Sequence, residues 1–283
     1  PICEVANVKD RYRMDTIFDN YRPDIVYHAA AYKHVPIIEK SPYEGIFVNV
    51  FGTRIVADTA LRYGAERFVM VSTDKAVNPT NVMGATKRVA ELYTQSLNEL
   101  GKTKFIATRF GNVLGSNGSV VPLFRKQIEN GGPITVTHEE ITRYFMTIPE
   151  ACNLVLEAGA MGQGGEVFVF DMGEPVKILD MAKKMIKLSG LELNKDISIE
   201  ITGLRPGEKL YEELLASSEN NLPTHHPKIM VAKVETYSYN AIKAHLDILT
   251  EIMIDGDVVG MVRKVKAIVP EYISQNSEFE ALD

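Results

Sequence analysis

The chain has 283 residues, a formal net charge of −6 at pH 7, 45% hydrophobic residues and 24% charged residues. This length and composition allow a sizeable buried core, arranged as one large α/β domain or as a core domain with a smaller one packed against it. The mildly acidic balance, without a long block of Lys or Arg, argues against a nucleic-acid-binding surface.

The start of the chain indicates a fragment. It begins at Pro1, without an initiator methionine or a signal peptide, in what looks like the tail of a strand (Ile2, Val5 and Val8). We therefore expect a folded part upstream. No apolar run approaches the roughly 18 residues that are needed to cross a bilayer. The two cysteines, Cys3 and Cys152, lie far apart without a metal-binding spacing, and we expect free, buried thiols in a reducing compartment.

Up to about residue 115, short apolar strands alternate with amphipathic helices. This pattern is typical of a parallel sheet that helices cover on both faces. Strands are predicted at residues 24–30, 67–73 and 104–113, and helices at residues 43–63 and 82–100, the second of which ends at Gly101. These elements predict an α/β fold with a doubly wound parallel sheet.

Beyond Gly115, turns that contain Gly and Pro separate shorter elements. We expect a strand at 134–137, an extended stretch at 143–148 and a helix at 149–160 that returns to the core. A small unit follows, with a strand at 167–170, a helix at 177–188, a strand at 197–201, a polar turn at 204–208 and a helix at 209–215. The last fifty residues have the pattern of an amphipathic helical appendage. We therefore predict three parts, a cofactor-binding core at 1–115, a smaller α/β substrate-binding part at 116–235 and the appendage at 236–283.

The most informative stretch covers residues 71–87. Ligands of open parallel sheets bind outside the carboxyl ends of the strands, and such an end carries Ser72, Thr73, Asp74 and Lys75. Met83 and Lys87, four residues apart at the start of the next helix, share one face of it. Hydroxyl, carboxylate and ammonium groups thus converge in one cleft, which suits proton transfer. The spacing alone leaves open a solvated loop with an Asp–Lys pair and a surface lysine.

Six segments, in this order, resemble the extended short-chain dehydrogenase/reductase family, specifically its polysaccharide-biosynthesis-type nucleotide-sugar 4,6-dehydratases. The segments are HAAAYKHVP at 28–36, NVFGT at 49–53, STDK at 72–75, RFGNVLGS at 109–116, RYFMT at 143–147 and RPGE at 205–208. The resemblance covers roughly residues 2 to 230, and it implies that the doubly wound sheet is of the Rossmann type.

Two departures from the family pattern matter. The Gly-rich phosphate turn is absent and would lie upstream of Pro1, so we expect this chain alone to bind a dinucleotide poorly. Met83 stands where most of the wider family has the tyrosine of a Tyr-x-x-x-Lys motif. This makes the resemblance closest to large, methionine-bearing dehydratases with an N-terminal membrane region. It implies a cytoplasmic catalytic part in a protein that is anchored in the inner membrane through the missing region.

The resemblance also implies a mechanism in which hydride passes from sugar C4 to NAD or NADP and returns to C6. Asp74 would protonate the departing C6 hydroxyl and Lys75 would remove the C5 proton. These roles predict a raised pKa for Asp74 and a lowered pKa for Lys75, with Lys87 as a possible cationic neighbour. Lys87 would also hold the nicotinamide ribose. Because a thioether cannot accept the C4 hydroxyl proton, that proton would go to water, to Ser72 or Thr73, or to the substrate.

The remaining site residues follow from the resemblance. Catalytic positions are Thr73, Asp74, Lys75, Met83 and Lys87. Cofactor-binding positions are Asn7, Val8, Ala29, Ala30, Ala31, Lys33, Asn49, Ser72, Thr73, Lys87 and Val113. Substrate-binding positions are Lys33, Asn112, Ser119, Val120, Val121, Thr135, Val136, Thr137, Arg143, Arg205 and Glu208. Arg143 and Arg205 would bind the diphosphate, although surface ion pairing is the alternative for either arginine. No metal is expected.

The implied reaction converts a UDP-sugar, specifically UDP-N-acetylglucosamine, to UDP-2-acetamido-2,6-dideoxy-4-hexulose for surface polysaccharide or glycan biosynthesis. Retention at C5 is favoured over inversion, and NAD versus NADP stays open. The resemblance implies homo-oligomers, since the family commonly self-associates through helices like those at 43–63 and 82–100. Two alternatives remain. A nucleotide-sugar 4-epimerase or reductase would not need the Asp74–Lys75 pair and would normally have tyrosine at Met83, and a non-catalytic regulatory protein would bind the cofactor without turnover.

Overall fold

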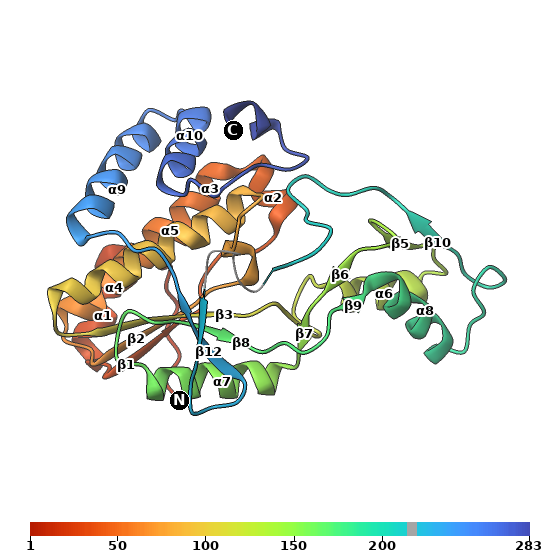
Figure 1. Ribbon diagram of the computed structural model, residues 1–283, viewed down its shortest axis with the longest axis horizontal. Helices are drawn as coiled ribbons and strands as arrows, with labels where there is room; N and C mark the ends of the chain where they lie inside the picture. Colours follow the sequence, from red (N-terminus) through yellow and green to blue (C-terminus); the bar gives the residue numbers. More distant parts are fainter. Residues whose placement is uncertain (214–219) are drawn as a thin grey trace.

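A computed structural model describes residues 1–213 and 220–283 (Figure 1). Its central sheet has the strand order β1-β2-β3-β8-β12-β11. The first four strands are parallel, and β12 and β11 each run antiparallel to the preceding strand in this order. The strands are β1 (Ile25–His28), β2 (Arg67–Val71), β3 (Lys104–Arg109), β8 (Val167–Phe170), β12 (Ile229–Lys233) and β11 (Asn220–Pro223).

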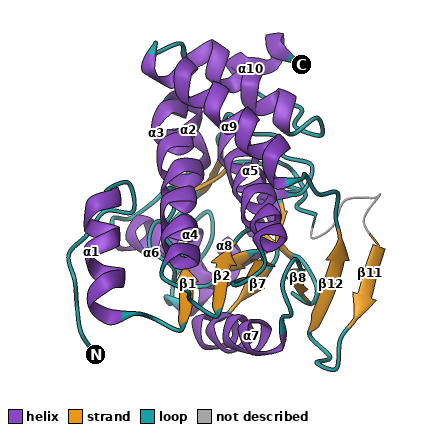
Figure 2. Ribbon diagram, turned by 90° about the vertical axis from the view of Figure 1, so that its left-hand side faces the viewer, coloured by secondary structure: helices purple, strands orange, loops and turns teal. Residues whose placement is uncertain are grey.

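Helices cover both faces of this sheet (Figure 2). Helix α7 (Ile148–Met161) packs on one face, and α1 (Arg11–Tyr21), α4 (Thr53–Arg62) and α5 (Val82–Ser96) pack on the other. Side chains of β2 alternate between the faces, because Phe68 and Met70 belong to the core under α5 whereas Val69 packs against α7. The predicted doubly wound α/β fold is therefore confirmed.

The predicted helix at 43–63 forms as three consecutive pieces. These are α3 (Pro42–Ile46), a π-helical turn (Phe47–Gly52) and α4, and they follow the short helix α2 (Val35–Lys40). The predicted helix at 82–100 forms as α5 and a 3₁₀ turn (Leu97–Leu100). It ends at Gly101, as predicted, because φ is +83° there and a glycine adopts the left-handed conformation at little cost.

The smaller part lies beyond the carboxyl ends of the main parallel strands (Figure 1). Its centre is the parallel pair of β5 (Ile134–Val136) and β10 (Ile199–Ile201), with α6 (Val120–Glu129) and α8 (Ile178–Leu188) packed around Phe124 and Ile134. Two short ladders connect it to the core. They are β4 (Asn112–Val113) with β7 (Phe145–Met146), and β6 (Thr142–Arg143) with β9 (Val176–Lys177).

Two element predictions were wrong, and one correctly predicted strand belongs to another sheet than expected. The strand at 104–113 is broken, because the chain leaves the main sheet after Arg109 and residues 112–113 pair with β7 instead. The strand at 167–170 belongs to the main sheet, where its four buried side chains pack beside β3, so the predicted range 116–235 is interleaved with the core. Residues 209–213 are not helical, because Lys209 and Glu212 are drawn inward by polar contacts. Residues 214–215 of that predicted helix lie outside the described residues.

The predicted C-terminal appendage is helical. It contains α9 (Tyr239–Ile254), α10 (Val258–Ile268) and a 3₁₀ turn (Glu278–Leu282). Helices α9 and α10 pack on α5, whose residues are all buried within the chain. The prediction that the helix at 82–100 forms a self-association surface was therefore wrong, because the chain covers this helix with its own helices. Homo-oligomerisation itself stays a prediction.

The exposure of the two cysteines differs from the expectation. Cys3 and Cys152 are free but exposed, so the expectation of buried thiols was wrong. Cys152 lies on an outward-facing position of α7 rather than on the face that packs on the sheet.

No helix within residues 1–213 and 220–283 combines the length and the apolar character that crossing a membrane requires.

Candidate active site

A cavity of about 520 Å³ lies between the carboxyl ends of the main parallel strands and the smaller part. Most of the predicted site residues line it: Ala29, Ala31, Lys33, Ser72, Thr73, Lys75, Met83, Lys87, Asn112, Val113, Ser119, Val120, Thr135, Val136, Thr137, Arg143, Arg205 and Glu208. The structure thus brings residues 72–87 together with segments up to residue 208. Its position matches the rule that open parallel sheets bind ligands at this edge.

Six predicted residues do not line the cavity. They are Asn7, Val8, Ala30, Asn49, Asp74 and Val121. Val8 packs beside Gly52, and the Asn7 side chain accepts a hydrogen bond from the Lys9 backbone. The cavity therefore gives no support for the predicted cofactor contact of Asn7, Val8, Ala30 and Asn49, or for the predicted substrate contact of Val121. Asp74 is a separate case, because it lies directly beneath the cavity wall.

Asn49 has a supporting position instead. Its fully buried amide accepts from the Tyr32 backbone N–H at 2.8 Å and donates to the Tyr32 carbonyl at 3.0 Å and to the Thr86 hydroxyl at 3.0 Å. These bonds tie the loop after β1 to helix α5. Asn49 therefore holds two cavity walls in register.

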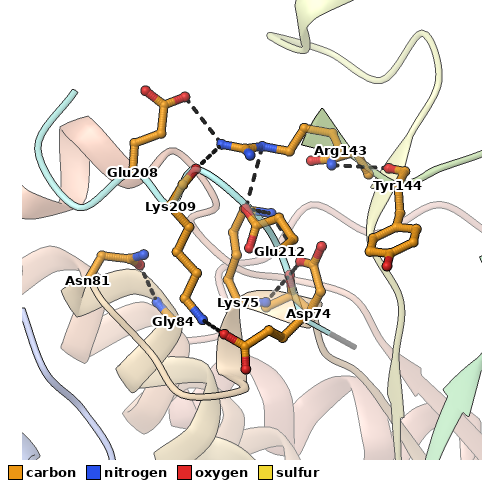
Figure 3. Close-up of polar contacts among 12 residues, drawn as sticks. Asp74, Lys75, Asn81, Gly84, Arg143, Tyr144, Glu208, Lys209 and Glu212 are labelled. Atoms are coloured by element: carbon orange, nitrogen blue, oxygen red, sulfur yellow. Dashed lines mark hydrogen bonds and ion pairs between the residues drawn. The ribbon is translucent and has the colours of Figure 1, made fainter. Parts of the chain in front are cut away.

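Lys75 and Glu212 line the cavity, and with Asp74, which lies behind the lining residues Thr73 and Lys75, they form a buried group of polar contacts (Figure 3). Lys75 Nζ lies 3.0 Å from Asp74 Oδ1 and 3.2 Å from Glu212 Oε1. Thr73 caps the 3₁₀ turn at Asp74–Ala76 and also donates to Asp74 Oδ1 at 2.8 Å. Asp74 is fully buried and the Glu212 side chain is 2% exposed. Asp74 Oδ2 and Glu212 Oε2 have no hydrogen-bond partner among the described residues.

The surroundings of this group agree with the predicted shift in the pKa of Asp74 and contradict the predicted shift in the pKa of Lys75. Burial, reinforced by the Glu212 charge, raises the pKa of Asp74, as predicted. Burial alone would lower the pKa of Lys75, but the carboxylates of Asp74 and Glu212 outweigh it and raise this pKa. The predicted lowering was wrong because the carboxylate of Asp74, reinforced by that of Glu212, which was not foreseen, stabilises the Lys75 ammonium group. The cation that opposes the charge of Lys75 is Arg143 rather than Lys87.

Lys87 lies on the first turns of α5 and lines the same cavity as Met83. It is 4% exposed, and its Nζ donates to the Val71 carbonyl at 2.9 Å. Burial lowers the pKa of Lys87 to about 8, with the Glu91 carboxylate opposing the shift. Lys87 is therefore still mostly charged at neutral pH.

This lowered pKa makes a testable stability prediction. The unfolded chain binds the Lys87 proton between pH 8 and 10.5 while the folded chain does not, so folding stability from this group rises with pH across that window. We expect the Lys87→Met variant to lack this rise, a difference of about 1.4 kcal/mol per pH unit. Denaturant midpoints from pH 7 to 10.5 measure it. The exposed Lys102→Met variant is the control and should follow the wild type, and parallel curves for all three proteins would contradict the prediction.

Arg143 is largely engaged by the segment that carries Glu212. Its guanidinium donates to the carbonyls of Lys209 at 2.9 Å and Leu210 at 3.3 Å, and it contacts Glu208 at 3.4 Å and Glu212 at 3.5 Å (Figure 3). Its side chain is 11% exposed, which excludes the surface-ion-pair alternative for this residue. Arg205, in contrast, is 55% exposed and paired with Glu208 at 3.1 Å.

Gly84 allows the close approach of α5 to the Asp74–Lys75 turn. The Asn81 side chain caps the helix by accepting from the Gly84 N–H at 2.8 Å (Figure 3). A methyl group on Gly84 would overlap the backbone carbonyl oxygen of Lys75. We expect Gly84→Ala to destabilise the protein by about 1–3 kcal/mol, because helix α5 and the Asp74–Lys75 turn must move apart to accommodate the methyl group. Thermal unfolding measures the loss, and a variant that is as stable as the wild type would contradict the contact.

The chain matches the family model described as "Polysaccharide biosynthesis protein" over residues 2–234. It belongs to this family. The capsular polysaccharide biosynthesis protein CapD of Staphylococcus aureus is 57% identical over 252 residues, which are 89% of this chain and 41% of CapD. The chain thus spans less than half the length of this curated relative.

Other proteins similar to this chain have more specific names. A Campylobacter jejuni protein named UDP-N-acetylglucosamine 4,6-dehydratase (inverting) is 36% identical over 222 residues, 77% of this chain and 63% of the relative. A UDP-glucose 4-epimerase of Rickettsia canadensis is 39% identical over 199 residues, 69% of this chain and 57% of the relative. The X-ray structure of Pen from Bacillus thuringiensis has a TM-score of 0.74 at 34% identity and covers 83% of this chain and 72% of Pen. The extended short-chain dehydrogenase/reductase assignment and the Rossmann-type fold are confirmed.

Within this family fold, two important carboxylates were missed in the sequence. Glu212 follows the RPGE segment by four residues, and its spacing from that motif is the only signal that could have pointed to it. Glu39 is buried and accepts from the Val82 backbone N–H at 2.6 Å, where it holds the start of α5. No sequence pattern distinguishes Glu39 from a surface glutamate of an amphipathic helix. Within residues 1–213 and 220–283, no group of three or more His, Cys, Asp or Glu side chains could hold a metal ion.

Proposed function

We propose that the chain carries the catalytic site of an NAD(P)-dependent 4,6-dehydratase of a UDP-sugar, and that the sugar is UDP-N-acetylglucosamine. The observation that carries the proposal is the direct 3.0 Å contact between a fully buried carboxyl, Asp74, and Lys75 at the floor of the cavity. Removing water from a sugar needs an acid at the departing hydroxyl and a base at the adjacent carbon, and this pair supplies both.

The residues present fit the nicotinamide end of a dinucleotide. Ala29 and Ala31 are small residues at the end of β1, and the buried Lys87 ammonium lies at the same wall of the cavity. Lys87 would hold the ribose, with Lys33 and Val113 beside it. The cofactor would supply the capacity to accept a hydride and to return it. The 4-keto group formed meanwhile acidifies the C5 hydrogen.

A single proton that Lys75 and Asp74 share would prepare both groups for their roles as base and acid. Transfer from Lys75 Nζ to Asp74 Oδ1 across 3.0 Å converts the ion pair into a neutral amine and a carboxylic acid without an external proton. Lys75 then takes the C5 proton while Asp74 gives its proton to the departing C6 hydroxyl, which leaves as water. Lys75 then gives C5 one of its ammonium protons, which exchange with solvent, while the hydride returned by the cofactor would add to C6. The proton from the C4 hydroxyl restores the pair through Thr73, which lines the cavity and donates to Asp74.

The UDP part would lie toward the smaller part of the chain. Arg205 is exposed enough to meet a diphosphate, with Arg143 and Asn112 lining the cavity beside it. Glu208 would accept hydrogen bonds from the ribose, and the uracil would lie between residues 119–120 and 135–137. The product would serve surface polysaccharide or glycan biosynthesis. We propose that this part of the protein works in the cytoplasm.

The test is the mass of the product. Full-length protein is incubated with UDP-N-acetylglucosamine and a catalytic amount of NAD or NADP. The proposal predicts loss of one water without net reduction of the cofactor. A product of unchanged mass but altered sugar configuration would instead establish a 4-epimerase, the alternative that the Rickettsia relative favours. Binding of the UDP-sugar without any turnover would indicate a regulatory protein.

A further inference from the structure

Glu212 is a buried carboxylate that the proposed mechanism leaves without a role. It lines the cavity, its side chain is 2% exposed, and it contacts two cations, Lys75 at 3.2 Å and Arg143 at 3.5 Å. Its second oxygen, Oε2, is buried without a hydrogen-bond partner among the described residues. A buried ion pair usually gains little stability over an apolar replacement. Stability alone therefore does not account for this carboxylate, and its two cationic neighbours point to a role in their chemistry.

We propose that Glu212 is a positioning residue that holds the Lys75 amine against Asp74 and, through its negative charge, sets the pH range in which this acid–base pair works. This inference rests on the proposed dehydratase function, because Glu212 would set the pH range of the acid–base pair that the function requires. Glu212 would not touch the reacting carbon atoms. It would act through Lys75.

The geometry supports such a role. Lys75 Nζ lies between two carboxylates, with Asp74 Oδ1 at 3.0 Å on one side and Glu212 Oε1 at 3.2 Å on the other. The two carboxylates come from segments far apart in sequence, and both contact this ammonium group (Figure 3). Without Glu212, Lys75 would have one anionic partner and would face the Arg143 guanidinium as a like charge. The amine would then be free to turn away from Asp74.

The charged groups around Glu212 come from three segments of the chain. Asp74 and Lys75 lie on the 3₁₀ turn after β2, Arg143 lies on β6, and Glu208 and Lys209 lie on the segment before Glu212. The three cations Lys75, Arg143 and Lys209 all stabilise the ionised form of Glu212. Burial opposes the ionised form of Glu212, but these cations outweigh it and hold the pKa of Glu212 below its ordinary value. The Arg143 guanidinium keeps its charge when Lys75 loses its proton, so Glu212 retains a cationic partner.

The placement of Glu212 also connects the acid–base pair to the UDP end of the cavity. Arg143 donates to the carbonyls of Lys209 and Leu210 and contacts Glu208, so it fixes the segment from which Glu212 projects. A diphosphate at Arg143 would compete with Glu208 and Glu212 for the guanidinium. Binding of the UDP part would thus alter the field at Lys75 before chemistry begins.

Loss of the Glu212 charge would move the pKa values of Asp74 and Lys75 in the same direction. The negative charge of Glu212 raises the proton affinity of both Asp74 and Lys75. Removing that charge lowers the pKa of both groups, so the neutral amine forms at lower pH and the protonated acid is lost at lower pH. Both limbs of a bell-shaped pH–kcat profile therefore move to lower pH. A residue that only held the fold would change the height of the profile and not its position.

The experiment compares wild type, Glu212→Gln and the matched control Glu213→Gln in the full-length protein. Glu213 is the adjacent residue and its side chain is 47% exposed. Limited acetylation with acetic anhydride at a series of pH values, followed by mass spectrometry of the Lys75 peptide, gives the titration midpoint of Lys75. We expect Glu212→Gln to lower this midpoint by at least about one pH unit, and Glu213→Gln to leave it unchanged.

Kinetics give the second readout. The pH–kcat profile of Glu212→Gln should shift downward by a similar amount, with KM for the UDP-sugar changed less than threefold. Unshifted midpoint and profile in a folded Glu212→Gln protein would overturn the inference. If Glu212→Gln does not fold, Glu212→Asp keeps the charge but withdraws it by one methylene. It should then show a smaller shift in the same direction, and no shift would overturn the inference. Because acetylation needs no turnover, a wild type that fails to dehydrate would overturn the proposed function without affecting this test.

Discussion

Replacing Asp74 by asparagine is expected to lower kcat for dehydration by about 10²- to 10⁴-fold, the usual contribution of a positioned acid. Asparagine keeps the shape of the side chain but cannot carry the proton that the departing C6 hydroxyl needs. It also removes the negative partner that Lys75 has at 3.0 Å. Since Asp74 does not line the cavity, we expect UDP affinity to change less than threefold.

Single-turnover assays and calorimetric titration with UDP measure the two quantities. Asp180→Asn, on an exposed position of α8, is the control and should retain wild-type turnover. An Asp74→Asn protein that still dehydrates at more than a tenth of the wild-type rate would remove Asp74 from the mechanism. The acid would then have to be sought among the other groups that line the cavity.

The largest expected effect on stability is at Arg109. Its guanidinium forms two bonds to Glu91, Nε to Oε1 at 2.9 Å and Nη2 to Oε2 at 2.7 Å, and neither side chain is exposed to solvent. Arg88 also contacts Glu91, at 3.3 Å. The Arg109→Met substitution leaves a buried carboxylate with one cation, and we expect it to destabilise the fold by about 3–5 kcal/mol.

Chemical denaturation of Arg109→Met and of the double variant Arg109→Met/Glu91→Leu measures this effect. The double variant should recover much of the loss, because it leaves no unpaired buried charge. Although Glu91 is buried, its cationic partners hold its pKa below its ordinary value. The stability that it contributes is therefore present above about pH 4.5 and is lost as pH falls through the folded pKa. An Arg109→Met protein within 1 kcal/mol of wild type would contradict this account.

The main sheet and the acid–base turn could be predicted because their signals are local. The strands at residues 25–28 and 67–71 are short apolar runs between helices, and parallel strands place their carboxyl ends at one edge. The spacing of Met83 and Lys87 puts both on one helical face. These two rules alone bring the Asp74–Lys75 turn to the same cavity as Lys87.

What could not be predicted depends on contacts between distant segments. The run at residues 167–170 has the pattern of a buried strand, but the pattern does not say which sheet it joins. Glu212 reaches Lys75 only because Arg143 holds the chain around Leu210, so its effect on the charge of Lys75 was missed. The periodicity of α9 and α10 predicts helices and not that they cover α5.

The most direct test of the central claim follows the hydride itself. UDP-N-acetylglucosamine labelled with deuterium at C4 is converted by the full-length protein with unlabelled cofactor, and the product is analysed by NMR. The account predicts that deuterium moves to the C6 methyl group of a 4-keto product, and that in D₂O one solvent deuterium enters at C5. Deuterium that stays at C4 of an isomerised sugar, or that is lost from the product, would contradict it.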